Sequence, residues 1–353
     1  MSALQSLFNI QFPLIQAPMA GVQGWELAAA VSGAGALGSI PCAMLTPDAV
    51  RDAVTHFRAR TDCPVNLNFF CHQSPEPDPE GQQCWLEQFL PWYAELGLEV
   101  PNAPAGPGRL PFNKVMADLV TELAPEVVSF HFGLPEPSLL EQVHSSGASI
   151  ISSATTVEEA CWLAQNGVDA IIAQGLEAGG HRGMFLSEEI STQIGTFALL
   201  PQIKAAVKVP VIAAGGIADA AGVQAALALG ADGVQVGTAY LLCSEANTSA
   251  VHRAALQSPG ASQTVLTNLF SGRPARGIVN RMIRELGPFN PSAPSFPLAT
   301  AASAPLRAQA ERLGSGDFSP LWAGQNVTGC RSIPAAELTL ALVSDLKPSV
   351  SSS

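Results

Sequence analysis

Eight short apolar runs recur along the chain, each followed by a polar or glycine-rich loop and then by a segment rich in alanine and leucine. The runs span residues 13–18, 35–40, 64–70, 127–132, 148–153, 169–174, 209–214 and 232–237. Most are continuously apolar rather than alternating, which is typical of parallel strands that are covered on both faces. Eight such units, complete near residue 245, predict an α/β fold of the (β/α)8 TIM-barrel type.

A doubly wound open sheet is the competing architecture. Such a sheet normally has about five or six strands and a G-x-G-x-x-G turn after the first of them. The sequence shows neither feature, so we favour the closed barrel. Helix-capping residues support the alternation of strands and helices. Thr46 and Asp219 each begin a helix, and Thr156 with Glu159 three residues later predicts a capping box for a helix over 157–166.

Two proline-rich stretches interrupt the repeat and define the expected domains. Residues 72–113, with one helix expected at 80–97, form an insertion after the third strand of a barrel domain that spans 1–245. Residues 246–330 form a small helical or irregular cap, with helices expected at 247–256 and 302–312. The remaining residues, 331–353, are expected to form a C-terminal helix packed on the barrel and a frayed tail.

Composition limits the partners and the cellular setting. The formal net charge of −12 disfavours nucleic acid and anionic membranes as partners. The apolar stretches are repeatedly cut by glycine, proline or charge, and the first 18 residues lack a basic segment, so we expect neither a membrane span nor a signal peptide. The seven scattered cysteines form no C-x-x-C pair, which predicts no metal site and a reducing, cytoplasmic location.

Four loops directly follow predicted strands and therefore meet at the carboxyl-terminal face of the barrel, where active sites of this fold lie. Gly215 and Gly216 follow the seventh strand, and Gly237 precedes Thr238 after the eighth. Loops at these two positions often hold a phosphate, because glycine lets backbone N–H groups approach an anion. We predict a phosphate site that belongs either to a substrate or to a flavin mononucleotide (FMN). The alternative is that these glycines only form tight turns.

Five segments, in this order, resemble the nitronate monooxygenase family: QAPMAG, VNLNFF, AQGLEAGGHRG, PVIAAGGIAD and GADGVQVGTAYL. The resemblance covers residues 10–245 and, more weakly, the remainder. It implies a TIM barrel with one non-covalent FMN, which oxidises alkyl nitronates with O2 to carbonyl compounds and nitrite. Neutral nitroalkanes are an additional class of substrate to be tested.

The resemblance also implies which residues contact the flavin. They are Pro18, Met19, Ala20, Asn68, Gln174, Gly179, Gly180, Gly215, Gly216, Gln235, Val236, Gly237 and Thr238. Asn66 lies two residues from Asn68 on the same strand face and is the alternative for that contact. Gln174 also has a purely structural interpretation, as a satisfied core amide at a strand end.

The family resemblance assigns the catalytic base to His181. Glycines surround this histidine, and an imidazole that titrates near neutrality suits removal of a proton beside a nitro group. The alternative is a capping or anion-binding histidine. His131, at the end of the fourth strand, is expected on the substrate side or as a structural histidine. His56, His72, His144 and His252 are expected at the surface or in loops, and Glu177 and Arg182 are expected to pair or to face solvent.

One departure from the family concerns tyrosine. Relatives with this loop place several tyrosines and a lysine around flavin and substrate, whereas this chain has only Tyr93 and Tyr240. Phe112 or Phe296 is expected to fill the space on the substrate side, but a phenyl ring donates no hydrogen bond to a nitro oxygen. The expected partners are a small nitro compound and O2, in a monomer or homodimer. An NAD(P)H-dependent flavin reductase acting on enoyl thioesters or quinones, and a flavin-binding protein with little turnover, are the alternative functions.

Overall fold

The computed structural model describes residues 2–101 and 109–348. Within these residues, eight parallel strands form one sheet in the order β1-β9-β8-β6-β5-β4-β3-β2. The strands are β1 (Leu14–Gln16), β2 (Gly38–Pro41), β3 (Val65–Phe70), β4 (Val127–His131), β5 (Ser149–Ala154), β6 (Ala170–Gln174), β8 (Val211–Ala214) and β9 (Gly233–Val236). A parallel bridge between Ile15 and Leu37 joins the two ends of the sheet. The predicted (β/α)8 barrel is therefore confirmed, and every strand overlaps a predicted apolar run.

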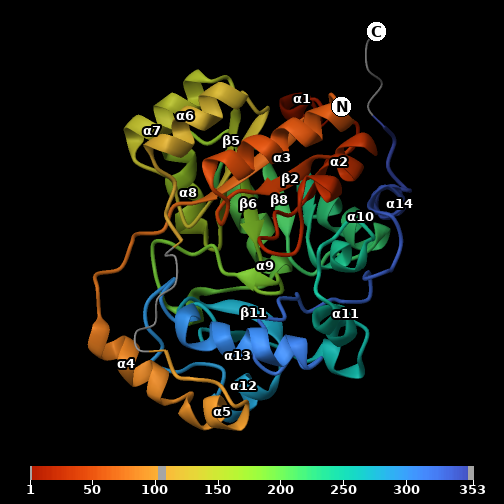
Figure 1. Ribbon diagram of the computed structural model, residues 1–353. Coiled ribbons are helices and arrows are strands. Elements are labelled where there is room, and N and C mark those ends of the chain that lie inside the picture. The colour runs from red at the N-terminus through yellow and green to blue at the C-terminus, as the bar shows by residue number, and fades with distance from the viewer. Residues whose placement is uncertain (1, 102–108, 349–353) are drawn as a thin grey trace.

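Helices cover the outside of the barrel, as the alternation predicted (Figure 1). They are α2 (Trp25–Gly33), α3 (Pro47–Arg60), α6 (Lys114–Leu123), α7 (Pro137–Ser145), α8 (Val157–Gln165), α9 (Thr196–Ala206), α10 (Ala220–Ala228) and α14 (Ala335–Leu342). Helix α14 packs against α2 and α10. The expected frayed tail lies partly outside the described residues.

The predicted helix caps are present, with one correction. The side chains of Thr46 and Asp219 accept hydrogen bonds from backbone N–H groups in the first turns of α3 and α10. Thr156 also caps α8, but the capping box is only half formed. The Glu159 carboxylate accepts instead from the backbone and hydroxyl of Thr155, both at 2.7 Å, and from the Phe185 backbone at 2.6 Å. The hydrogen bonds that the Glu159 carboxylate accepts from Thr155 and Phe185 take the place of the second bond of the capping box.

An N-terminal helix closes the end of the barrel at which the strands begin. Helix α1 (Ala3–Phe8) buries Leu4 and Phe8 in one apolar cluster with barrel residues that include Ile15 and Ile212. This helix was not predicted from the sequence, because six residues are too few to show a helical period. Since α1 fills the end where the strands begin, the opposite, carboxyl-terminal end of the barrel remains for a site.

A second apolar core lies beyond that end and joins the insertion to the segment after β9. The helices and strands of these two segments are α4 (Pro79–Glu87), α5 (Leu90–Glu95), α11 (Ala250–Leu256), β10 (Thr264–Thr267), β11 (Ala275–Ile278), α12 (Arg281–Leu286) and α13 (Thr300–Arg312). Short 3₁₀ helices span Ile190–Thr192, Thr238–Leu242 and Pro259–Ser262. Trp85 and Phe89 from the insertion pack with Met282 and Leu306 from the later segment. We call the insertion, together with the segment between β9 and α14, the cap. Figure 1 shows the helices of the cap gathered beneath the barrel.

The single helix expected at 80–97 is thus two helices, and the expected pieces at 247–256 and 302–312 correspond to α11 and α13. Strands β10 and β11 and helix α12 were not predicted. The domain boundaries at 245 and 330 stay a prediction.

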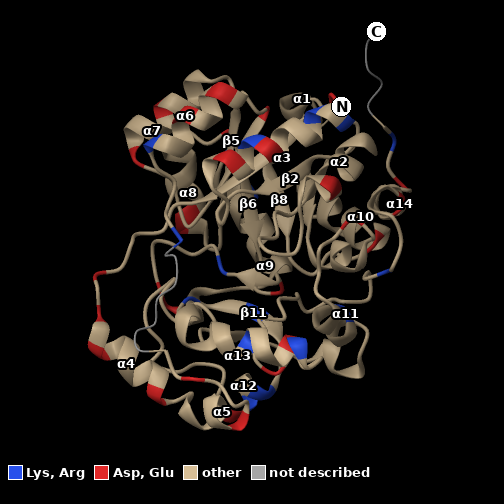
Figure 2. Cartoon of the chain, in the orientation of Figure 1, with Lys and Arg blue, Asp and Glu red and all other residues tan. Residues whose placement is uncertain are grey.

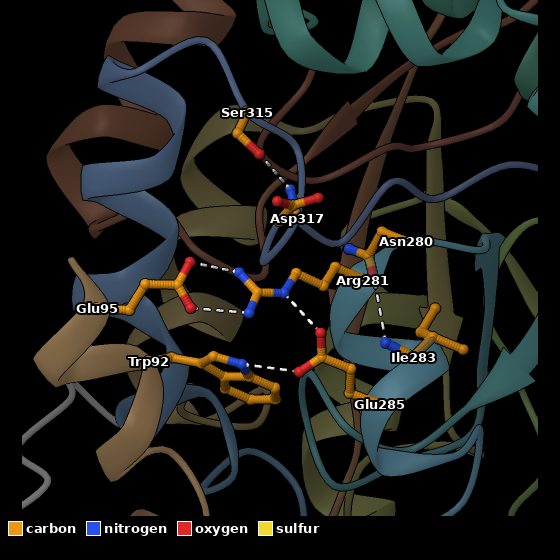
Figure 3. Close-up of polar contacts among 8 residues, drawn as sticks. All are labelled: Trp92, Glu95, Asn280, Arg281, Ile283, Glu285, Ser315 and Asp317. Atoms are coloured by element: carbon orange, nitrogen blue, oxygen red, sulfur yellow. Dashed lines mark hydrogen bonds and ion pairs between the residues drawn. The ribbon is translucent and has the colours of Figure 1, made fainter.

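Polar contacts hold the two sequence segments of the cap together (Figure 3). Both terminal nitrogens of Arg281, on α12, donate to the Glu95 carboxylate of α5 at 2.6 and 2.8 Å. The Arg281 Nε donates to Glu285, whose second oxygen accepts from the Trp92 indole N–H at 3.0 Å. The insertion is therefore anchored to the later segment by charge as well as by its apolar core.

Charged side chains lie mainly on the outer helices and loops, and acidic groups outnumber basic ones (Figure 2). Among the described residues, every helix is too short or too polar to cross a membrane.

Candidate active site

A cavity lies at the carboxyl ends of the barrel strands, between the barrel and the cap. Fourteen of the predicted site residues line it: Pro18, Met19, Ala20, Asn68, His131, Gln174, Gly179, Gly180, His181, Gly215, Gly216, Gln235, Gly237 and Thr238. Asn68, rather than Asn66, faces this cavity. Two predicted residues do not line it. Val236 is packed in the barrel core, and Phe296 is buried beside His181 without lining the cavity.

The loop after β6 is fastened by a buried arginine. Arg182 has no exposed surface, and its two terminal nitrogens donate to the carbonyl oxygens of Gly175 and Gln174, each at 2.7 Å. Burial lowers its pKa to about 10. The Glu177 carboxylate accepts instead from the backbone and hydroxyl of Thr196 at the start of α9. The expectation that Glu177 and Arg182 pair or face solvent is therefore wrong, because each fixes a loop.

His181 is held where the barrel meets the cap. It belongs to a short strand, β7 (Gly180–His181), that pairs antiparallel with β11 in the cap. Its carbonyl oxygen accepts from the Gln174 side chain at 3.0 Å and from the His131 Nε2 at 3.2 Å. Its own Nε2 lies 2.8 Å from the Ser271 hydroxyl. Residues from β4, β6 and the β10–β11 loop thus position one imidazole.

His131 uses both ring nitrogens for structure. Its Nε2 faces a carbonyl oxygen and must carry the proton, so Nδ1 accepts from the Ser153 hydroxyl at 3.1 Å. Burial, together with Arg273 and Arg182, lowers its pKa to about 3. A neutral ring with both nitrogens occupied has no free lone pair to offer a substrate. His131 therefore acts on the site by positioning His181.

His181 is also neutral at pH 7. Burial lowers its pKa well below the ordinary value, and Arg109, His131 and Arg273 lower it further. Ser271 Oγ also lies 3.4 Å from the Arg273 carbonyl oxygen. When the hydroxyl donates to that carbonyl, the His181 Nε2–H donates to Ser271, and Nδ1 keeps the free lone pair of the ring. His181 can accept a proton there, but as a weak base.

Aromatic rings enclose the imidazole. Phe296 and Trp322 have ring centroids 5.4 and 5.5 Å from that of His181, and Phe70 lies 6.4 Å away. Phe296 thus packs beside His181, and its role on the substrate side stays a prediction. Phe112 packs on Phe130 in the barrel core instead. Tyr93 and Tyr240 are buried away from the cavity, where their hydroxyls contact Ala302 and Thr339.

Two arginines bring positive charge to this enclosure. The Arg109 guanidinium lies over the Phe296 ring at 5.5 Å, and that of Arg273 lies over the Phe132 ring at 4.1 Å. Within the described part of the chain, the guanidinium of Arg109 has neither a hydrogen bond nor an ion pair. The Nε of Arg273 is buried and has no partner there. No carboxylate of the described residues contacts either guanidinium, although Glu188 and Glu159 partly offset the charge of Arg273. The positive charge of Arg109 is not offset in this way by a described residue, so the enclosure favours an anion beside Arg109.

Opposite this enclosure, the strand ends form a cradle with little side-chain bulk. Gly215 and Gly216 have φ angles of +119° and +75°, a conformation that favours glycine. A Cβ on Gly237 would lie 3.3 Å from the Ala17 Cβ and 3.7 Å from the Met19 sulfur, both of which line the cavity. The Thr238 hydroxyl accepts from the Gly324 backbone at 2.9 Å and keeps its own proton to donate. The Gln235 side-chain oxygen is buried without a partner in the described residues.

Several residues of the site were not predicted from the sequence. Arg109, Trp322 and His252 line the cavity, and Ser271 contacts His181. His252 and His72 are each only 4% exposed. His72 lies in a loop as expected, although it is buried there. His252 is buried within α11, so the expectation of a surface or loop position is wrong for this residue. His252 and His72 bond to the backbone carbonyls of Trp322 and Arg109. No local pattern marks these residues, because they come from cap segments far along the chain.

Comparison with known proteins places the chain among close relatives. The family model described as nitronate monooxygenase matches residues 1–345. A nitronate monooxygenase from Pseudomonas aeruginosa is 42% identical over 97% of this chain and 98% of its own length. The structure of a nitroalkane oxidase from Streptomyces ansochromogenes superposes with a TM-score of 0.88 at 38% identity, covering 98% of both chains. FabK from Thermotoga maritima is less similar, with a TM-score of 0.74 at 27% identity over 98% of this chain and 96% of its own.

Proposed function

This chain belongs to the nitronate monooxygenase family, and on that premise we propose that it uses FMN to oxidise alkyl nitronates with O2 to carbonyl compounds and nitrite. The motifs that carried the resemblance all lie inside the matched range of 1–345. The match extends beyond the barrel into the cap. The alternative of an NAD(P)H-dependent reductase on the same barrel is less favoured, since the nitroalkane oxidase is the more similar structure.

The residues of the cradle fit FMN. A terminal phosphate is suited to the backbone at Gly215, Gly216 and Gly237 and to the free proton of the Thr238 hydroxyl. The partnerless Gln235 oxygen supplies an acceptor for a ring N–H group. Asn68 and Gln174 bring amides to the same wall, although the Gln174 amide already bonds to its own loop. When bound, FMN supplies the redox chemistry with the substrate and O2.

The positive charge near His181, above all that of Arg109, supports the choice of substrate. Arg109 and Arg273 both lower the pKa of this histidine, which means that their field reaches the imidazole. The same field stabilises an anion placed there. A nitronate carries one negative charge spread over two oxygens, which a guanidinium can pair with two N–H donors. We infer that Arg109 orients the nitronate group against the flavin side of the cavity.

The other residues exclude water and hold the geometry. Phe70, Phe296 and Trp322 surround His181 and lower the local dielectric, which strengthens the pairing of nitronate with arginine. His181 with its weak Nδ1 base accepts a proton only when the substrate arrives as a neutral nitroalkane. A preformed nitronate needs no such step. We place the protein in the cytoplasm, with a nitro compound and O2 as its small-molecule partners.

The substitution Arg109→Gln tests this proposal. Losing a charge-assisted hydrogen bond costs about 1.5–3 kcal/mol, so the KM for propyl nitronate should rise about 10- to 100-fold in a nitrite-release assay. Arg312→Gln is the matched control, because it removes one positive charge from the exposed end of α13. Equal effects of the two substitutions, or no nitrite from the unchanged protein, would contradict the proposal.

A further inference from the structure

A second cavity adjoins the first on the side of the cap. It lies between the loops after β2 and β3 and the first turns of α13. Met44, Phe70 and Arg109 line both cavities, so the two share one wall. Arg109 is the single charged residue among the described lining residues of the second cavity.

The second cavity is apolar in composition. Its walls include Leu45, Phe69, Leu110, Phe112, Val115, Met116, Pro297, Leu298 and Ala301. Most of its polar side chains are already engaged. Thr46 and Asn113 cap α3 and α6, and the Thr300 hydroxyl donates to the Phe270 carbonyl at 2.8 Å. Gln82 is the remaining uncharged amide. Such walls offer contact to hydrocarbon and few hydrogen bonds to anything else.

Small residues on α13 leave the space open. Thr300, Ala301 and Ala304 are the residues that this helix contributes before Pro305. On the facing side, three large apolar side chains are exposed although they line the cavity: Met44 is 53%, Leu110 70% and Val115 59% exposed. Exposed apolar side chains that converge on one hollow mark a binding site more often than chance surface exposure does.

We propose that this cavity, which we call the tail pocket, binds the hydrocarbon chain of the substrate while Arg109 holds its nitronate group. The proposal rests on the function proposed above and adds a substrate class, namely nitronates with an unbranched apolar chain of several carbons. Charge and hydrophobicity are arranged for such a molecule. The unpaired guanidinium stands at the shared wall, and the apolar surface extends from it away from the flavin cradle.

The first test compares kcat/KM for nitronates with increasingly long chains, from that of nitroethane to that of 1-nitrooctane. Each is used below the concentration at which it forms micelles. Burying one methylene group contributes about 0.8 kcal/mol, so kcat/KM should rise up to about fourfold per added carbon until the pocket is full. Ala304→Leu fills part of the pocket and should flatten this rise. Ala308→Leu makes the same change one turn further along α13, outside the pocket, and should leave the rise intact.

A second measurement separates failure of the pocket from failure of the function. Alkyl carboxylates also spread one charge over two oxygens but are not oxidised, so their binding to the flavin-loaded protein reports on the pocket alone. Affinity by calorimetry should rise from butanoate to octanoate in the unchanged protein and in Ala308→Leu, and should rise less in Ala304→Leu. If carboxylates show this rise while no nitronate is oxidised, the pocket stands and the proposed function fails. If neither series depends on chain length, or if both variants flatten it equally, the tail pocket is wrong.

Discussion

The Nε2 of His131 lies 3.2 Å from the carbonyl oxygen of His181, so the side chain of one histidine fixes the backbone of another across the barrel mouth. The contact links β4 to the strand that continues into the cap sheet. It explains how a histidine with a strongly lowered pKa still serves the site. His131 contributes by directing its Nε2–H group at the His181 carbonyl oxygen.

Substitutions at His131 should therefore separate hydrogen bonding from titration. His131→Gln keeps an N–H donor of similar reach, whereas His131→Leu leaves the His181 carbonyl with one donor fewer. The Gln174 side chain still donates to that carbonyl, so the loss is that of one hydrogen bond, about 0.5–1.5 kcal/mol. We therefore expect kcat/KM on propyl nitronate to fall about two- to tenfold in His131→Leu. His131→Gln should restore most of it, with an unchanged pH profile. Equal losses in both variants would mean that the imidazole itself takes part in the reaction.

Stability should fall on the acidic side because of buried histidines. Burial lowers the pKa of His131 to about 3 and that of His252 to about 4. Below pH ~6.5 the unfolded chain binds protons that the folded chain does not, so the free energy of unfolding decreases as the pH falls. Each group contributes a slope of up to about 1.4 kcal/mol per pH unit between pH ~6.5 and its folded pKa.

The measurement is denaturant unfolding of the flavin-loaded protein between pH 8 and pH 5. We expect a plateau near pH 7–8 and a decline below it. The decline should be shallower in His131→Gln, which removes one of the groups. An identical acidic slope in this variant would show that His131 does not titrate on unfolding.

Flavin content should depend on the absence of a side chain at Gly237, which lines the cavity. A Cβ there would approach the Ala17 Cβ at 3.3 Å, and the backbone of Gly237 itself tolerates a side chain, since its φ angle is −115°. Gly237→Ala should fold but bind FMN much more weakly, and Gly237→Val should be colourless. Gly216 gives a less clear test, because its φ angle of +75° strains any replacement.

Gly260→Ala is the control for that experiment, at an exposed position outside the cavity. Absorbance at the flavin bands, with circular dichroism to confirm folding, measures the outcome. A fully yellow Gly237→Val protein would place the phosphate elsewhere.

Much of this architecture was predictable from sequence, for a physical reason. Barrel strands are buried on both faces, so segments such as 170–173 are continuously apolar and easily recognised. The glycine loops after β8 and β9 were predictable because a cradle of this kind requires glycine at fixed places. The resemblance to a family then located His181 within its loop.

The remainder depends on contacts between distant segments. Arg182 follows a glycine-rich loop and suggests a surface charge, yet its donors satisfy strand-end carbonyls that sequence patterns do not show. Ser271 and Arg109 reach the site from segments about 90 and 70 residues away from His181, and no periodicity links them. The positive charge and the hydroxyl group beside His181 could therefore be recognised only from the three-dimensional structure.

His181→Asn distinguishes two classes of substrate. A positioned general base contributes about 10²–10⁴-fold, and only a neutral nitroalkane needs one. The variant should lose turnover of neutral 1-nitropropane and keep most of its activity on propyl nitronate. Because the lowered pKa makes His181 a weak base, the unchanged protein should itself be slower on the neutral compound. A parallel loss of both activities would make His181 a binding residue.

The central claim is that the enclosure around Arg109 and His181 presents an anionic nitronate to a bound flavin. The direct measurement is anaerobic mixing of the purified yellow protein with propyl nitronate or with NADH, followed through the flavin absorbance. We predict that the nitronate bleaches the flavin rapidly and that NADH changes its absorbance little. In Arg109→Gln, the same rate of bleaching should require a higher concentration of nitronate. Bleaching by NADH with none by the nitronate would contradict the account and favour a flavin reductase.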